Sequence, residues 1–258
     1  MLPRLSRRLT MAALGGVSVF AVACGTTEAP DPLSPSGAQG RIRFVNLITD
    51  TTRGRVNAIL ESVPFGVNLT YTVSTPAALP SPATATYSPI LTGSRTLVLK
   101  RTIDTNTVVS TFAVTITEGQ DRTVYAVGGT GGSAIASFVT TDDNTLPTVG
   151  TQAKVRVVHL SPTPGAVDLF VTATGADLAA ATPVLTNIAN QSASAYLNLN
   201  AGTYQVRAVP AGTAAGSRAA SVIITASVAL NGGTVRTIVA ADNNVGGAPL
   251  RAFVLTDR

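Results

Sequence analysis

The stretch VRVVHLSPTPGAVDLFV, residues 155–171, places a short apolar run on each side of a turn. In the second run Val167, Leu169 and Val171 alternate with other side chains, and this period of two is typical of a half-buried strand. The Pro- and Gly-containing segment 161–165 between the runs is typical of a tight connection. The stretch therefore predicts strand, turn and strand.

The first of these runs occurs twice in the chain. Residues 41–47 (RIRFVNL) align without a gap with residues 154–160 (KVRVVHL). Two further blocks repeat near the ends of the copies: 122–124 matches 236–238, and 136–142 matches 251–257. The offset drifts only from 113 to 115 residues across these blocks. An offset this constant indicates a tandem duplication.

The duplication predicts two domains, residues 41–143 and 153–258. Composition favours strands, because 45% of the 258 residues are hydrophobic, only 12% are charged and none is Trp. It also argues against disorder, coiled coils and multi-pass membrane proteins. We expect two all-β, antiparallel β-sandwiches of around seven strands each, with Phe112, Val114 and Ile116 on one buried strand face. Helix is expected only as a turn near Asp177 to Ala181.

The second copy resembles a known family. Residues 155–171 resemble the opening of DUF4397 domains, a VRVVHASPDAP-like run followed by AVDVYVDG, and residues 201–207 (AGTYQVR) are similar to a later strand of that family. The resemblance implies an immunoglobulin-like or transthyretin-like sandwich with no established activity. The first copy departs from the pattern, since Asn46 replaces the His and an Ala/Pro/Thr-rich insertion occupies about Thr75 to Thr86.

The N-terminus has the pattern of an export signal. Three arginines precede an apolar stretch, residues 11–22, which has signal-peptide length and is too short to span a bilayer. The segment Ala21-Val22-Ala23-Cys24 then resembles the lipobox of bacterial lipoproteins. That resemblance implies cleavage after residue 23 and acylation of Cys24, including palmitate. The Pro- and Gly-rich residues 24–40 would form a flexible tether.

The anchor and the charge set our expectations for location and partners. A lipid-anchored chain binds the membrane, and Gly25 after the cysteine favours an outer membrane or cell surface over the inner membrane. Without Arg4, Arg7 and Arg8 the net charge is near +2, and the remaining cations are scattered singly. We therefore expect no nucleic-acid partner. An envelope protein or polysaccharide is the expected partner, and the sequence makes no prediction of the oligomeric state.

The single histidine, His159, is the first candidate for catalysis. A triad would pair it with Ser161 and Asp168, but no nucleophile elbow is present and alternation points Asp168 away from Val167. Asn46 stands at the matching position of the first copy and cannot act as a base. We expect His159 to tie its strand end to the following turn.

Two other motifs are interpreted structurally. The glycine-rich segment Gly128 to Gly132 lacks the Lys-Ser/Thr and helix of a P-loop, so we expect a hairpin connection. Two acidic runs carry oxygen ligands of the kind that calcium prefers, but neither has EF-hand spacing. These runs are Asp142-Asp143-Asn144 and Asp242-Asn243-Asn244. We expect no metal and no cofactor.

Together these features predict a non-enzymatic, envelope-anchored lipoprotein that displays two Ig-like domains for structural or adhesive contacts. The surface between the two units and the sheet edges are the expected contact regions. The alternative is a small-ligand, glycan or Ca²⁺ binding module of the envelope. An envelope hydrolase is a third hypothesis, which requires a pocket that gathers polar residues from both copies.

Overall fold

The computed structural model describes residues 36–76 and 86–258. The leader, Cys24 and most of the tether lie outside the described residues, as does most of the insertion predicted at about Thr75 to Thr86. All described residues belong to one compact unit, Pro35–Arg258.

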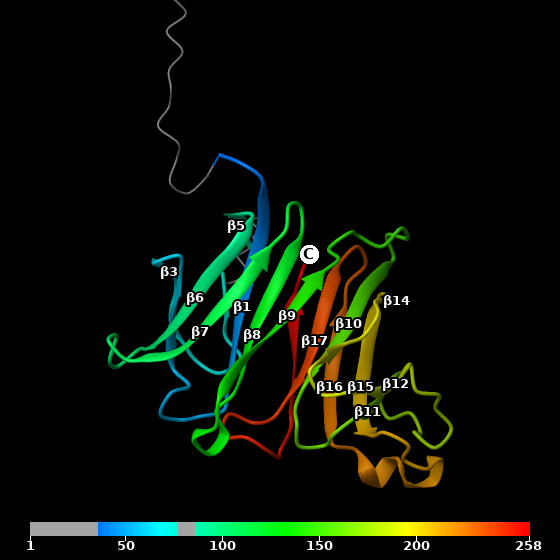
Figure 1. The fold of residues 1–258 in the computed structure, drawn as a ribbon. Helices are drawn as coiled ribbons and strands as arrows, with labels where there is room; N and C mark the ends of the chain where they lie inside the picture. Colours follow the sequence, from blue (N-terminus) through cyan, green and yellow to red (C-terminus); the bar gives the residue numbers. More distant parts are fainter. Residues whose placement is uncertain (1–35, 77–85) are drawn as a thin grey trace, which may run out of the picture. The chain divides into compact units, whose positions relative to one another are not determined.

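The described chain is almost entirely β structure, and nine strands fall in each copy (Figure 1). The strands of the first copy are β1 (Gln39–Ile48), β2 (Val56–Leu60), β3 (Val63–Leu69), β4 (Ser74–Thr75), β5 (Ser88–Leu91), β6 (Gly93–Arg101), β7 (Val108–Ile116), β8 (Asp121–Gly128) and β9 (Ile135–Asp142). Those of the second are β10 (Gln152–Leu160), β11 (Val167–Thr172), β12 (Leu185–Ile188), β13 (Ser192–Ala193), β14 (Leu197–Asn200), β15 (Gly202–Pro210), β16 (Ile224–Leu230), β17 (Val235–Ala241) and β18 (Arg251–Thr256).

Each copy is a sandwich of two sheets with the same topology. In the first copy the β1 sheet has the order β4-β1-β8-β9 with β5 also paired to β1, and the β2 sheet has the order β3-β2-β6-β7. In the second copy the β10 sheet has the order β13-β10-β17-β18 with β14 also paired to β10, and the β11 sheet has the order β12-β11-β15-β16. The predicted fold class, two tandem β-sandwiches, is confirmed.

We expected antiparallel sheets throughout, but the β1 sheet and the β10 sheet each contain one parallel pair. β1 pairs with β8 in parallel, with Val45 opposite Tyr125, and β10 pairs with β17 in parallel, with Val158 opposite Val239. These central strands are buried on both faces over most of their length, as parallel strands usually are. Side-chain alternation reports which face is buried and not the direction of the neighbouring strand, so the sequence did not reveal this pairing.

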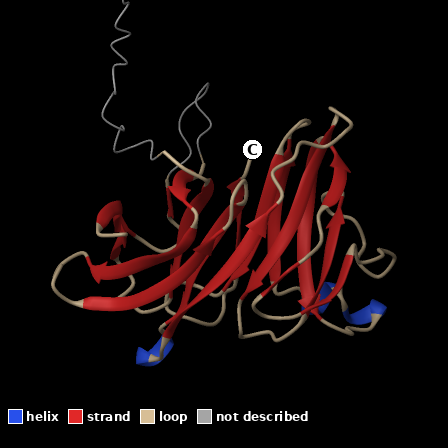
Figure 2. Cartoon of the chain, turned by 45° about the horizontal axis from the view of Figure 1, so that its top comes forward, coloured by secondary structure: helices blue, strands red, loops and turns tan. Residues whose placement is uncertain are grey.

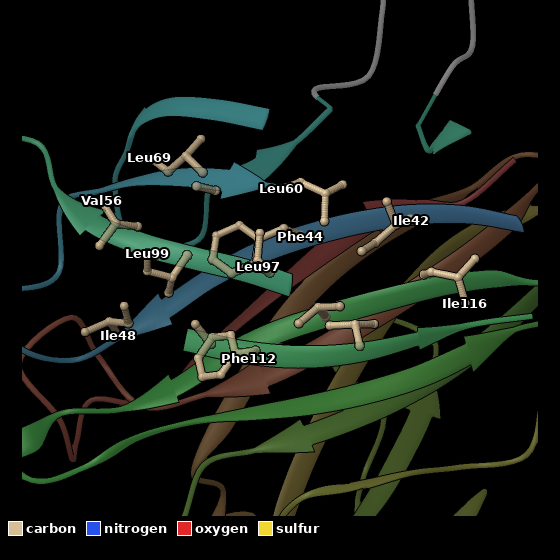
Figure 3. Packing of buried hydrophobic residues seen from close by; sticks show 14 residues of the cluster. Ile42, Phe44, Ile48, Val56, Leu60, Leu69, Leu97, Leu99, Phe112 and Ile116 are labelled. Carbon is tan, nitrogen blue, oxygen red and sulfur yellow. The ribbon is translucent and has the colours of Figure 1, made fainter. Parts of the chain in front are cut away.

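Each sandwich has its own apolar core. In the first copy Phe44, Leu97, Leu99 and Phe112 meet between the two sheets (Figure 3). The predicted buried face of residues 112–116 is confirmed, because Phe112, Val114 and Ile116 all belong to this core. Burying one such side chain contributes about 1.5–3 kcal/mol.

The core of the second copy includes Val155, Val157, Val167 and Leu169, as alternation predicts. On β11, residues that face away from this core are buried as well. Asp168, for example, accepts hydrogen bonds from the backbone N–H groups of Asn187 and Gly212, at 2.8 and 3.1 Å.

The helix expected near Asp177 to Ala181 is a turn. Instead, the described residues contain three short 3₁₀ segments in loops, at Thr130–Gly132, Ala215–Ser217 and Ala219–Ser221 (Figure 2). The segment at 177–181 turns because Leu178 packs beside Phe170 on the outer face of the β11 sheet. The Arg218 guanidinium covers the Phe170 ring and donates to the Ala181 carbonyl at 2.8 Å. Tertiary contacts therefore decide the conformation of this loop.

Candidate functional site at the junction of the two copies

An apolar cluster joins the β1 sheet to the β10 sheet. Its buried side chains come from both copies: Val45, Leu47, Tyr125 and Val127 from the first, and Val158, Leu160, Val239, Ala241 and Leu255 from the second. In each central strand these residues alternate with those that fill the sandwich core. The second face of the β1 and β10 sheets is therefore the junction between the copies.

A buried arginine of the first copy crosses this junction to an aspartate of the second. The Arg43 Nη2 atom lies 2.6 Å from Asp257 Oδ1, and both side chains are almost fully buried. Arg43 Nη1 also donates to the Thr256 carbonyl at 3.0 Å, and Arg43 Nη2 donates to the Thr123 hydroxyl at 2.9 Å. The guanidinium is thus paired with a charge and with neutral acceptors, which a buried cation requires.

An arginine of the second copy makes the equivalent contacts with the first copy. Arg156 forms an ion pair with Asp142 and donates to the Thr141 carbonyl and the Thr237 hydroxyl, each at 3.0 Å. Arg156 follows Arg43 by 113 residues, and the aspartates Asp142 and Asp257 are 115 apart, within the offsets of the duplication. Each copy therefore gives an arginine to the other and receives one. An interface with this reciprocity has the character of a two-fold dimer within one chain.

Two tyrosines sit over the two guanidinium groups. The Arg43 guanidinium carbon lies 4.6 Å from the Tyr87 ring centre, and that of Arg156 lies 5.1 Å from the Tyr196 ring centre. The Tyr87 hydroxyl also donates to Asp142 Oδ2 at 2.8 Å. Burial, with the nearby aspartates Asp257 and Asp142, raises the pKa of Tyr87 above its ordinary value. Its hydroxyl is therefore protonated at neutral pH and available as a donor.

Burial opposes the charged form of both partners, and their mutual attraction favours it. Burial opposes the charge of Arg43, yet Asp257 and its other neighbours raise the pKa of the guanidinium. Burial also raises the pKa of the Asp257 carboxyl, and Arg43 and the Thr237 hydroxyl oppose that rise. Arg is protonated at all ordinary pH values, so the pair titrates only through the carboxyl.

A cleft of about 370 Å³ opens where loops of the two copies meet. Asp50, Arg55 and Tyr71 line it from the first copy, and Asn244 and Arg251 line it from the second. The Tyr71 hydroxyl donates to the Asp242 backbone carbonyl across the junction at 2.5 Å. This bond fixes the aromatic wall of the cleft to the second copy.

The three members of the supposed triad serve different partners. His159 Nε2 lies 2.7 Å from the Gly165 carbonyl, Ser161 donates to Asp242, and Asp168 accepts two backbone N–H groups. His159 thus contacts the turn that follows its strand, as the sequence predicts. In the first copy Asn46 does the same, donating to the Gly54 carbonyl at 2.6 Å.

Most of the calcium candidates are occupied by protein donors. Asp143 pairs with Lys154 at 2.6 Å, and hydrogen bonds from Lys154 and Thr145 lower its pKa to about 2. In the second run the carboxylate of Asp242 accepts from Ser161, Thr163 and the Gly247 N–H. Within residues 36–76 and 86–258 no three His, Cys, Asp or Glu side chains are arranged to hold a metal.

The glycine-rich segment Gly128 to Gly132 connects β8 to β9, so the expected hairpin connection is confirmed. Its residue Thr130 lies against Gly246 in the matching loop of the second copy. A Cβ added at Gly246 would fall 2.6 Å from the Thr130 methyl carbon, and Gly246 has a φ of +88°. A close approach of two loops and a left-handed backbone both require glycine there.

Replacing His159 with Asn should cost no more than about 1 kcal/mol, the usual value of one hydrogen bond. Asn46 shows that a carboxamide can bond the equivalent carbonyl. Burial lowers the pKa of His159, and the Gly165 carbonyl and Asp242 only partly oppose it. The unfolded imidazole titrates near pH 6.5, so the wild type should lose stability as the pH falls below that value.

The Asn variant lacks this titration and should lose less stability on acidification than the wild type. Urea unfolding at pH 7.5 and pH 5.5 measures both effects. A loss above about 3 kcal/mol at pH 7.5 would show that His159 does more than secure the turn.

Sequence reasoning missed the residues that join the copies. Arg43, Arg156, Asp142 and Asp257 all stand inside the aligned repeat blocks, but the single cations were considered only as evidence against a nucleic-acid partner. The available signal was an arginine repeated at the duplication offset inside an apolar run. An arginine that stands at the matching position of both copies, in a strand that is apolar on both faces, indicates a buried partner of opposite charge.

The fold and the junction define a tandem β-sandwich protein whose copies pair through one shared face. The sequence profile of the family described as "Domain of unknown function (DUF4397)" matches residues 42–170 and 171–258. The chain belongs to this family, as the residues 155–171 indicated. The boundary between the two matched segments, at residues 170 and 171, lies inside β11. The structural boundary lies earlier, because β9 is the last strand of the first sandwich and β10 is the first strand of the second.

Among curated proteins none matches the chain. Among solved structures it is similar to the Bacillus anthracis TIE protein, with 12% sequence identity and a TM-score of 0.22 over 80% of this chain. The match covers 34% of that protein, so the chain spans about a third of its length.

Proposed function

We propose that the protein is a non-enzymatic, lipid-anchored envelope protein that displays its two sandwiches as one unit for structural or adhesive contacts. The observation that supports this most is the reciprocal pairing of Arg43 with Asp257 and of Arg156 with Asp142. These four charged side chains hold the two copies together. The expected partner is an envelope protein or polysaccharide.

A fixed pairing suits a contact protein. Breaking a buried ion pair by losing one partner costs several kcal/mol, and here two such pairs act beside a shared apolar cluster. The two copies would therefore present their outer sheets at a constant spacing. A partner that touches both copies would not have to order them first, which lowers the entropic cost of binding.

The proposed anchor is Cys24 in its lipobox-like segment. One acyl chain holds a protein on a membrane only marginally, whereas several on one residue hold it stably. Among residues 36–76 and 86–258 no helix is long and apolar enough to cross a membrane. We propose an outer membrane or cell-surface location, reached through the acylated cysteine.

Replacing Cys24 with Ser should move the full-length chain from the membrane fraction to the soluble fraction, because the hydroxyl is not acylated. Gly25→Ala is the matched control, since it changes the next residue and keeps the thiol. Mass spectrometry of the wild-type N-terminal peptide should find the acyl groups on Cys24. An unmodified Cys24, or cleavage at another bond, would contradict the anchor.

The contact role is tested by mild cross-linking on intact cells and by retention on purified envelope polysaccharide. The lipidated chain should be recovered joined to an envelope protein or retained on the polysaccharide. A chain that remains free of both, or that turns over a small substrate, would contradict the proposed function.

A further inference from the structure

The cleft at the junction combines groups from both copies. Asp50, Arg55 and Tyr71 belong to loops and strand ends of the first copy, and Asn244 and Arg251 belong to the second. Its volume of about 370 Å³ lies within the range of sites for small molecules. The cleft exists only while the copies are docked.

Both arginines of the cleft have free guanidinium groups. Arg55 and Arg251 are exposed, and within the described part of the chain neither side chain forms an ion pair or a hydrogen bond. Most other arginines here are engaged with carboxylates, hydroxyls or carbonyls, as Arg53 is with Asp50. Two unpaired guanidinium groups beside one cleft attract an anion from two sides.

The one carboxylate in the cleft does not cancel this charge. Asp50 is held by the Thr52 hydroxyl, by Arg53 and by two backbone N–H groups. These hydrogen bonds, the Thr52 hydroxyl first, lower the pKa of Asp50, so it is ionised and its charge is matched by Arg53 at 2.6 Å. Arg55 and Arg251 therefore leave the cleft with a net positive charge.

The neutral groups of the cleft suit a ligand that has many hydroxyl groups. Thr51, Thr70 and Asn244 supply hydroxyl and amide groups that can donate and accept. The ring of Tyr71 forms a wall that its hydrogen bond to the Asp242 carbonyl holds in place. A wall fixed before binding loses little conformational entropy when a ligand arrives.

We propose that this cleft binds an oxyanion carried on a polyhydroxylated molecule, with Arg55 and Arg251 as its two cationic contacts. The planar guanidinium matches carboxylate and phosphate oxygens, so the anion is an acidic sugar or a phosphorylated polyol. The site goes beyond the contact role and does not depend on the lipid anchor. It uses one arginine from each copy and so depends on their docking.

Calorimetric titration of the purified full-length chain tests the site with three probes. Trigalacturonate carries carboxylates, glycerol phosphate carries a phosphate, and maltotriose is a neutral sugar of similar size to the first. We expect binding of an anionic probe and none of maltotriose. Trigalacturonate alone would identify a carboxylate carrier, and glycerol phosphate alone would identify a phosphate carrier.

The variants Arg55→Gln and Arg251→Gln should each weaken binding of the anionic probe by about tenfold or more, as expected for loss of one charged hydrogen bond. Arg41→Gln is the matched control, because it removes one positive charge near the start of β1, at the opposite end of that strand from Ile48, which lines the cleft. It should bind as the wild type does. Equal binding of maltotriose, an equal loss in all three variants, or no binding of either anion would overturn the proposal.

Discussion

Replacing Arg43 with Met is expected to lower the free energy of unfolding by about 3–5 kcal/mol. The substitution keeps most of the side-chain volume and removes the guanidinium, which leaves Asp257 buried without its counter-ion. Because the pair joins the two copies, the variant should also weaken the docking of one copy on the other, which the Arg156–Asp142 pair and the apolar cluster still hold. Urea unfolding followed by circular dichroism measures the loss.

Arg41 offers a matched control two residues away on the same strand. Arg41 also lies 2.6 Å from a carboxylate, that of Asp121, but its side chain is 54% exposed. Water reaches this pair through Arg41, and the buried Asp121 keeps a hydrogen bond from Asn144 at 2.6 Å, so Arg41→Met should cost about 1–2 kcal/mol, clearly less than Arg43→Met. Equal losses in the two variants would show that burial of the Arg43 pair is not what holds the junction.

The duplication supplies an internal repeat of this experiment. Arg156→Met removes the matching guanidinium from Asp142 and should lose about as much stability as Arg43→Met. The double variant should lose less than the sum, because Tyr87 contacts both aspartates and Arg43 lies 3.9 Å from Asp142. Groups that share one network do not add independently.

Replacing Phe44 with Ala is expected to cost about 3–5 kcal/mol by opening a cavity in the first sandwich. Phe44 is fully buried among Leu97, Leu99 and Phe112 (Figure 3). Because the cavity is closed between two sheets, neighbouring side chains can fill it only in part. The midpoint of urea unfolding should fall with little change in slope.

The control for this prediction is Val63→Ala on β3, the edge strand of the other sheet of the same sandwich. Val63 is 64% exposed, so its truncation should change stability by less than about 0.5 kcal/mol. The docked copies should unfold together in one transition. Phe44→Ala should therefore lower the urea midpoint at which both copies lose their structure. Two separate transitions in the wild type would contradict this coupling.

The sequence was sufficient for the architecture of each copy because the relevant forces are local and repeated. Alternation placed Phe112 and Val114 on a buried face, and the repeated block at 41–47 and 154–160 implied two equal domains. His159 was correctly placed against the turn that follows it. These predictions needed only the spacing of apolar residues and nearby turn chemistry.

Predictions that depended on distant contacts were wrong or were not made. The parallel pairing of β1 with β8 arises from the path of the chain through the second sheet, which alternation does not encode. The turn at 177–181 is decided by Leu178 packing beside Phe170. The role of Arg43 depends on Asp257, a residue 214 positions away.

By itself, the sequence determined that this protein is a duplicated β-sandwich of the DUF4397 family, because period-two burial and a constant offset are properties of the chain read in order. Only the tertiary structure decided that the copies share a face, cross two arginines over it and leave Arg55 and Arg251 beside one cleft. The sequence gives the residue type of a charged side chain in a strand, but not whether that side chain faces water or a carboxylate of the other copy. Its partner becomes known only when both surfaces are in place.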